Sequence, residues 1–141
     1  MNLSELLTNL HINYISILKS VASNYNISIS QLLCILSIPY DGINQSALSQ
    51  KLSIDLSTLS RNLDKLIIKN ILFKEGSKYD KRSYVIKLTQ LGETLYEDIT
   101  VKLNQSINEI NKVLEYDQIE PLINSITLLN WYLSKKHQLN E

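Results

Sequence analysis

The sequence predicts a mainly α-helical chain with one small β-hairpin, an α+β protein folded as a single domain over residues 1–141. Apolar residues recur every three or four positions over most of the chain, which is the spacing of amphipathic helices. Only three glycines and two prolines interrupt this pattern. Two short runs between residues 72 and 88, rich in β-branched and aromatic residues, flank a Gly-Ser turn and predict the hairpin.

The first two predicted helices differ in how they should be buried. An apolar stripe from Leu3 to Val21 indicates a long amphipathic first helix. Ser28 and Gln31 form a capping box, in which each side chain bonds to the other residue's backbone, and this box begins a second helix. That helix is apolar on nearly all sides and should be buried. A turn over residues 39–42 should end it.

Two further helices are predicted before the hairpin. Asn44 is a good N-cap for a short third helix over residues 45–52. Asp55 should cap a fourth helix that runs to Asn70. Asparagine tolerates the left-handed backbone conformation with which many helices end, so Asn70 suits that position.

After the hairpin, the sequence predicts two helices with long apolar stripes. Thr89 should begin a helix that extends to about residue 115, and Asp117 with Glu120 forms a second capping box before a final helix that ends near Lys136. A chain of this size cannot bury such stripes in its own core. We therefore expect them to contact a partner surface.

The charge is unevenly distributed, although the whole chain has a formal net charge of zero. Residues 48–90 contain nine Lys or Arg and four Asp or Glu, a net charge of +5, which leaves −5 for the remainder. A basic segment within an acidic chain is typical of a polyanion-binding face. The alternative is a solvated helix face on which the cations cluster by chance.

The remaining composition excludes several classes of protein. No apolar run approaches the 18 residues of a membrane span, and no targeting segment is recognisable, so a cytoplasmic location is expected. Cys34 lies in an apolar run and is expected to be a buried structural thiol. His11 and His137 are isolated and give no metal-ligand spacing. We find no converging catalytic set, and expect neither an enzyme nor a cofactor.

The fourth predicted helix has the pattern of a recognition helix. If its four leucine and isoleucine positions (Leu59, Leu63, Leu66 and Ile67) face the core, Arg61 lies at the centre of the opposite side. Ser57, Thr58, Asp64 and Lys65 flank it. The short third helix and tight turn before it fit helix-turn-helix geometry, and an arginine can form two hydrogen bonds to guanine. The alternative is an ordinary amphipathic helix with a solvated outer face.

The hairpin follows this helix where a winged helix has its wing, and its tip is basic. Lys78, Lys81 and Arg82 lie at the tip, where a guanidinium can enter a narrow minor groove. Asp80 should fix the shape of the tip by accepting a hydrogen bond from the Arg82 guanidinium or from a neighbouring backbone amide. Arg61 and Arg82 are the only arginines beside twelve lysines, and both lie on elements expected in the grooves.

Residues 48–96 resemble the core of the MarR family of bacterial transcriptional regulators. The wing motif Asp80-Lys81-Arg82 and the entry to the following helix, residues 88–92 (LTQLG), carry the resemblance. The sequence departs from the family pattern at Asn70, where glycine is usual. The resemblance implies a winged helix-turn-helix lobe over residues 28–88. It also implies dimerisation through the helices in 1–27 and 89–141.

Further expectations follow from the resemblance. A homodimer should bind double-stranded DNA at a pseudo-palindromic operator and act as a repressor. The resemblance implies that Arg82 enters the minor groove, and that the recognition-helix residues lie in or beside the major groove: Ser57, Thr58, Ser60 and Arg61, to which we add Lys65. Family members often bind small aromatic or lipophilic effectors, and Tyr14, Tyr25 and Tyr40 could line such a pocket, with plain core aromatics as the alternative. The alternative function is a winged-helix module that binds another protein.

Overall fold

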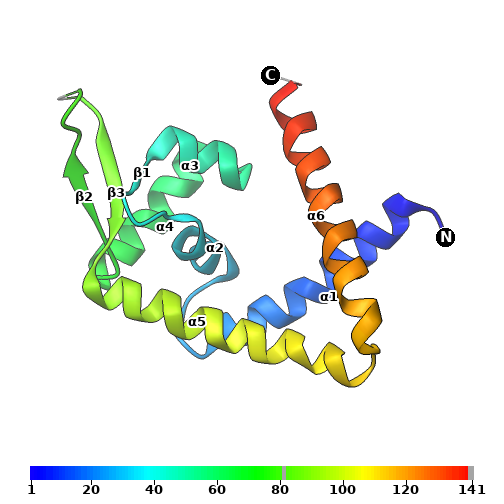
Figure 1. Cartoon of the computed structure of the whole chain (residues 1–141). Coiled ribbons are helices and arrows are strands. Elements are labelled where there is room, and N and C mark those ends of the chain that lie inside the picture. The colour runs from blue at the N-terminus through cyan, green and yellow to red at the C-terminus, as the bar shows by residue number, and fades with distance from the viewer. Residues whose placement is uncertain (81, 140–141) are drawn as a thin grey trace. The chain divides into compact units, whose positions relative to one another are not determined.

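The computed structural model describes residues 1–80 and 82–139, and Figure 1 shows the chain. The described residues form six α-helices, one 3-10 helix and three strands. They are α1 (Leu3–Ser23), α2 (Ile29–Ser37), β1 (Ile43–Asn44), α3 (Gln45–Leu52), α4 (Leu56–Ile68), β2 (Leu72–Gly76), β3 (Tyr84–Leu88), α5 (Gln90–Asn108), the 3-10 helix (Glu109–Lys112) and α6 (Tyr116–Leu139). The predicted α+β class is therefore confirmed. The chain divides into two compact units, Met1–Leu103 and Asn104–Glu141.

The first unit contains the hydrophobic core. Fully buried side chains come from α2, α3, α4, the sheet and α5, and include Leu32, Leu48, Leu59, Ile86 and Ile99, each at most 1% exposed. Together they join the helix-turn-helix and the hairpin to α5. The second helix is buried as predicted on most of its surface, except that Leu33 remains 36% exposed.

The hairpin belongs to a three-stranded antiparallel sheet with the strand order β1-β3-β2. Strands β2 and β3 pair from Leu72 opposite Leu88 to Gly76 opposite Tyr84, so the hairpin is confirmed. Strand β1 pairs Ile43 with Ile86 and was not predicted. Two residues are too short for a strand periodicity to be visible in the sequence.

The predicted helix boundaries in the first unit are largely confirmed. Ser28 and Gln31 form both hydrogen bonds of a capping box. Asn44 accepts from the amide of Ala47, and Asp55 caps α4. Helix α4 ends at Ile68, and Asn70 then adopts a left-handed conformation with φ of 58°. Asparagine therefore fulfils there the role that glycine has in the family pattern.

Two predictions for the C-terminal region are wrong. Helix α5 ends at Asn108 and a 3-10 helix follows, so the expected single helix to residue 115 is interrupted. Apolar residues three positions apart lie on one side of a 3-10 helix as well as of an α-helix. The sequence pattern therefore does not distinguish the two kinds of helix. The cap of α6 is also different, because Gln118 accepts from the Glu115 amide where the Asp117–Glu120 box was expected. Helix α6 ends at Leu139, beyond Lys136.

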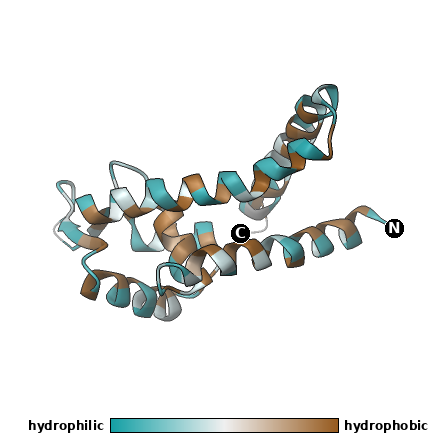
Figure 2. Cartoon of the chain, turned by 90° about the horizontal axis from the view of Figure 1, so that it is seen from below, coloured by the Kyte–Doolittle hydropathy of each residue, from teal (hydrophilic) through white to brown (hydrophobic). Residues whose placement is uncertain are grey.

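The N-terminal and C-terminal helices expose long apolar stripes, as expected. Figure 2 shows hydrophobic residues recurring along α1. Leu3, Leu6, Leu10 and Ile12 on α1 are each more than half exposed. In the second unit none of the described side chains is buried, and α6 exposes Ile123, Ile126 and Trp131 by half or more. Exposed stripes of this length indicate surfaces that bind a partner.

Candidate nucleic-acid interface

Helices α3 and α4 form a helix-turn-helix. Ser53, at the C-cap of α3, has a left-handed conformation with φ of 53°, and the Ile54 amide donates to the Ser49 carbonyl over 3.1 Å. Asp55 then begins α4. Three residues thus turn the chain between two helices that pack against each other. This is the connection expected before a recognition helix.

The side chains of α4 divide into a buried and an outer face. Leu59, Leu63 and Leu66 are completely buried. The predicted recognition residues lie away from that leucine row: Ser57, Arg61 and Lys65 are exposed, and Thr58 and Ser60 are partly buried. The structure therefore brings these five residues together on one helix. Their contact with DNA stays a prediction.

Asp55 organises the start of α4 more extensively than a simple cap. Its carboxylate accepts from the Thr58 amide over 2.8 Å, from the Thr58 hydroxyl over 2.8 Å and from the Ser57 hydroxyl over 2.5 Å. These hydrogen bonds hold the pKa of Asp55 well below its usual range, and the bond from Ser57 makes the largest contribution. Because both hydroxyl protons are donated to Asp55, the Ser57 and Thr58 hydroxyls can only accept a further hydrogen bond. The spacing of Asp55 from Thr58 in the sequence is the signal for this network.

The wing tip is shaped by the hydrogen bonds of Asp80. Its carboxylate accepts from the Arg82 amide over 2.9 Å, and its carbonyl accepts from the Ser83 amide over 3.2 Å. Of the two donors considered for Asp80 in the sequence, the structure shows the backbone amide. The Lys78, Asp80 and Arg82 side chains are exposed. Lys81 lies outside the described residues.

The outer face of the hairpin holds a separate ion pair. The Lys87 ammonium lies 2.6 Å from the Glu75 carboxylate, on neighbouring strands. The hydrogen bond from Lys87 lowers the pKa of Glu75. One acid and one base of the basic segment therefore compensate each other there.

A latch at the base of the hairpin fixes the wing to α5. The Thr89 hydroxyl donates to the Asn70 carbonyl over 2.7 Å and accepts from the Gly92 amide over 3.0 Å, while the Thr89 amide donates to the Ile71 carbonyl over 3.0 Å. Gly92 lies so close to Ile71 that a Cβ atom would stand 2.1 Å from its carbonyl oxygen. The glycine is therefore required for the close approach of α5 to the hairpin.

The three tyrosines predicted to line one effector pocket are not brought together. Tyr40 borders a cavity of about 380 Å³ beside α5, and Tyr25 borders another of about 620 Å³. Tyr14 lines neither cavity and is 40% exposed on α1. Neither of these two cavities is lined by more than one of the three tyrosines.

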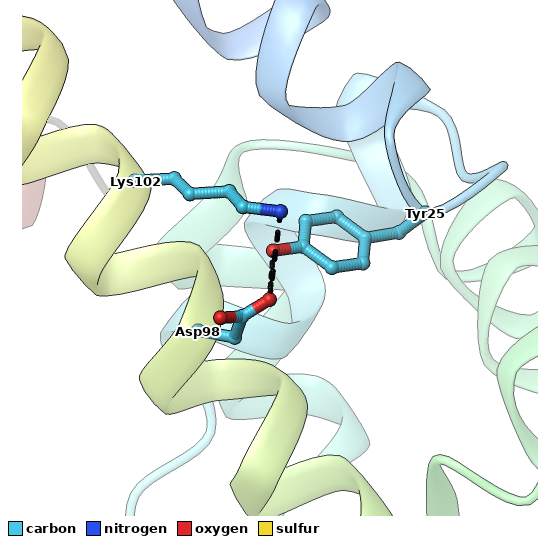
Figure 3. A network of polar contacts seen from close by, with 3 residues as sticks. All are labelled: Tyr25, Asp98 and Lys102. Atoms are coloured by element: carbon cyan, nitrogen blue, oxygen red, sulfur yellow. Dashed lines mark hydrogen bonds and ion pairs between the residues drawn. The ribbon is translucent and has the colours of Figure 1, made fainter.

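Tyr25 takes part in a polar network that links the end of α1 to α5 (Figure 3). Its hydroxyl donates to the Asp98 carboxylate, and the Lys102 ammonium lies 4.5 Å from the centre of its ring and 3.6 Å from Asp98. Desolvation and the hydrogen bond to Asp98 raise the pKa of Tyr25, against the opposing effect of Lys102. The hydrogen bond from Tyr25 lowers the pKa of Asp98. Sequence reasoning missed this network because its members are distant in the chain.

Cys34 is completely buried, and desolvation raises the pKa of its thiol to about 11, as suits a structural cysteine. In the described part of the chain, no three His, Cys, Asp or Glu side chains are grouped as metal ligands. No described helix is both long and apolar enough to cross a membrane.

Comparisons with known proteins place the chain in a family. Residues 16–99 match the family described as transcriptional regulator SarA/Rot. The multiple antibiotic resistance protein MarR of Salmonella typhimurium is 32% identical over 112 residues, which cover 78% of this chain and 73% of that protein.

Solved structures agree with this placement. Wild-type MarR from E. coli in its apo form has a TM-score of 0.81 at 26% identity, covering 92% of this chain and 96% of that one. A MarR mutant from E. coli complexed with operator DNA has a TM-score of 0.72 at 26% identity, covering 90% and 92%. These families are regulators and not enzymes, as predicted. The chain belongs to the SarA/Rot transcriptional regulators and, with its winged helix-turn-helix lobe, to the MarR family.

Proposed function

We propose that this chain binds DNA sequence-specifically as a homodimer and represses transcription from a pseudo-palindromic operator. The observation that carries the proposal is the placement of the two arginines. Arg61 is exposed on the outer face of α4, and Arg82 is exposed on the wing. In a winged helix these elements enter neighbouring grooves, where Arg61 reads base edges and Arg82 reads groove width. The MarR mutant that was solved in complex with operator DNA supports DNA as the partner of this fold.

The local charges favour a DNA backbone as the partner. Arg61, Lys65, Lys78 and Arg82 are all exposed in the segment that has a net charge of +5. The acids of this segment are partly engaged within the protein: Asp55 binds two hydroxyls, and Glu75 pairs with Lys87. Lys and Arg side chains that neutralise DNA phosphates release the counterions condensed on the DNA, so binding should weaken steeply with salt.

The exposed apolar stripes of α1 and α6 support a second copy as the partner of this chain. We assign residues 28–88 to the DNA-binding lobe, and residues 1–27 and 89–141 to dimerisation. The mass in solution should then be twice the 16.2 kDa of one chain. Replacing Ile126, which is 50% exposed on α6, by Glu should shift the protein toward a monomer, as measured by light scattering. A wild-type monomer would contradict the dimer.

A finer part of the proposal concerns release from DNA in the cytoplasm. A small aromatic or lipophilic effector would bind the cavity beside Tyr40 or the cavity beside Tyr25, which differ in their acidic residues. Either cavity borders α5, so a ligand there would act on the element to which the wing is latched. Such a compound should inhibit operator binding in a saturable way. Loss of this inhibition in Tyr25→Ala or in Tyr40→Ala would identify the cavity that binds it.

DNA selection from a random library tests the central proposal. The purified wild type should enrich an inverted repeat whose half-sites lie about one helical turn apart. Arg82→Ala should then bind the selected duplex more weakly. Lys87→Ala, on the opposite face of the same hairpin, is the matched control and should bind nearly as the wild type does. When the operator is placed before a reporter gene, the wild-type protein should lower expression of that gene.

Three results would contradict the proposal in whole or in part. If no sequence is enriched and binding stays weak, the winged surface does not read DNA, and a protein partner becomes the better interpretation. If Arg82→Ala and Lys87→Ala weaken binding equally, the wing contributes only general charge. An increase of reporter expression would retain the DNA site and replace repression by activation.

A further inference from the structure

A polar hollow lies between the root of the wing and the start of α3. It has a volume of about 420 Å³ and is lined from α3 by Gln45 and Ser46, and from the hairpin by Lys74, Arg82 and Tyr84. We call it the wing-root hollow. Of its lining residues, only Arg82 belongs to the DNA-contacting set predicted from the sequence.

The register of the hairpin places Lys74 on the side of the hollow. Lys74 pairs with Ile86, which is 1% exposed, so the two side chains share the sheet face that packs toward the helices. Glu75 and Lys87, which form the hairpin ion pair, occupy the alternate positions and therefore the opposite face. The acid next to Lys74 in sequence is thus turned away from the hollow.

The lining of the hollow is suited to an anion. It contains an ammonium, a guanidinium and a phenol hydroxyl, with no Asp or Glu among its lining residues. The cavities beside Tyr40 and Tyr25 differ, since acidic residues line both of them. Asp80, the acid nearest to Arg82 in sequence, binds the Arg82 amide. With Arg82 assigned to the minor groove, Lys74 is the cation that remains in the lining, and no carboxylate of the lining opposes its attraction for one negative charge.

We propose that the wing-root hollow seats one phosphate of the DNA backbone, with Lys74 as its principal cation. The inference rests on the proposed DNA-binding function and deepens it. A winged helix with α4 in the major groove and its wing in the next minor groove must straddle the phosphate strand between those grooves. The hollow lies between the hairpin and the start of α3, the helix that precedes α4, and Lys74 in its lining can meet that strand. Lys74 then fixes register and carries no base preference.

The test combines single-site neutralisation of the DNA with substitution of the protein. Methylphosphonate replaces the phosphate at one position at a time along the selected operator half-site. Wild type, Lys74→Gln, Lys74→Arg and Lys87→Gln are titrated with each duplex. For the wild type, methylphosphonate at the position that occupies the hollow should weaken binding roughly two- to fivefold, the range of an exposed charge contact. Lys74→Gln should lose this sensitivity at that position alone.

The salt dependence gives a second readout. Each lost phosphate contact reduces the slope of log K against log salt by about 0.9, so Lys74→Gln should lower it by that amount per protomer. Its base preference should stay unchanged. Lys74→Arg retains the charge and should keep both slope and sensitivity. Lys87→Gln is the control on the opposite hairpin face and should behave as wild type.

The outcomes separate this inference from the function on which it rests. If Lys74→Gln and wild type respond alike at every methylphosphonate position, no phosphate occupies the hollow and the inference is overturned, although sequence-specific binding stands. The same holds if Lys74→Gln alters the selected sequence, because Lys74 would then read bases. If wild type enriches no sequence, the proposed function itself fails. Circular dichroism establishes that each variant is folded before titration.

Discussion

Gly92→Ala is the substitution for which the structure gives the clearest magnitude. The added Cβ would stand 2.1 Å from the Ile71 carbonyl oxygen, whereas a carbon and a carbonyl oxygen normally stay about 3.3 Å apart. Helix α5 and the base of the hairpin would therefore separate by roughly 1 Å, measured against that contact distance. The separation strains the Thr89 hydrogen bonds to Asn70 and Ile71, which hold the two elements together.

Several contributions set the size of the effect. Overpacking costs about 1–3 kcal/mol, and each weakened hydrogen bond costs about 1 kcal/mol. Alanine offsets about 1 kcal/mol through its better helix propensity. The free energy of unfolding of Gly92→Ala should therefore fall by about 2–4 kcal/mol, and operator affinity should fall with it because the wing is displaced.

Urea denaturation at a fixed protein concentration measures this effect, since the proposed dimerisation would make apparent stability depend on concentration. Gly76→Ala is the matched control. A Cβ at Gly76 would meet nothing within 4 Å, so this variant should stay within about 0.5 kcal/mol of wild type. If Gly92→Ala is as stable as Gly76→Ala, the close approach of α5 to Ile71 is not as described, and the latch does not position the wing.

Three further predictions concern titratable groups. Asp55 stabilises the fold above its unfolded pKa and loses this effect as pH falls toward its lowered folded pKa. The stability difference between wild type and Asp55→Ala should therefore shrink below about pH 4 in urea unfolding measured against pH. Cys34 should resist a thiol reagent at pH 8 and react fully in denaturant, because its pKa is raised to about 11; rapid native labelling would contradict its burial. In ultraviolet titration, Tyr25→Phe should remove a component that ionises above the ordinary range of a tyrosine, because burial and the hydrogen bond to Asp98 raise the pKa of Tyr25.

The sequence predicted the parts of the fold that depend on local physics. Capping by Ser28, Asn44 and Asp55 needs only a polar side chain and an amide three residues later, so the pattern is visible in one dimension. The same is true of Asn70. Its left-handed conformation follows from its residue type and from its position just after the apolar pattern of α4 ends. The outer position of Arg61 follows from the period of α4 alone.

Features that depend on distant contacts could not be predicted in the same way. The hydrogen bond between Tyr25 and Asp98 joins residues 73 positions apart, and nothing in the sequence near either one indicates the other. Strand β1 exists because Ile43 meets Ile86 across the sheet. The wing-root hollow likewise requires that the start of α3 meets the hairpin, which fixes the environment of Lys74. In the second unit, the apolar spacing continues unchanged from α5 into the 3-10 helix. The sequence therefore does not reveal where one kind of helix gives way to the other.

Asp55 and Asp80 illustrate a balance between attraction and order. A carboxylate in a basic segment reduces its attraction for phosphate. Asp55 nevertheless fixes the hydroxyls of Ser57 and Thr58 at the start of α4, and Asp80 fixes the Arg82 amide at the wing tip. Each therefore lowers the conformational freedom that binding would otherwise have to remove. We expect Asp80→Asn to preserve affinity better than Asp80→Ala, because its amide oxygen still accepts from the Arg82 amide. Equal loss in both variants would instead assign the importance of Asp80 to its charge.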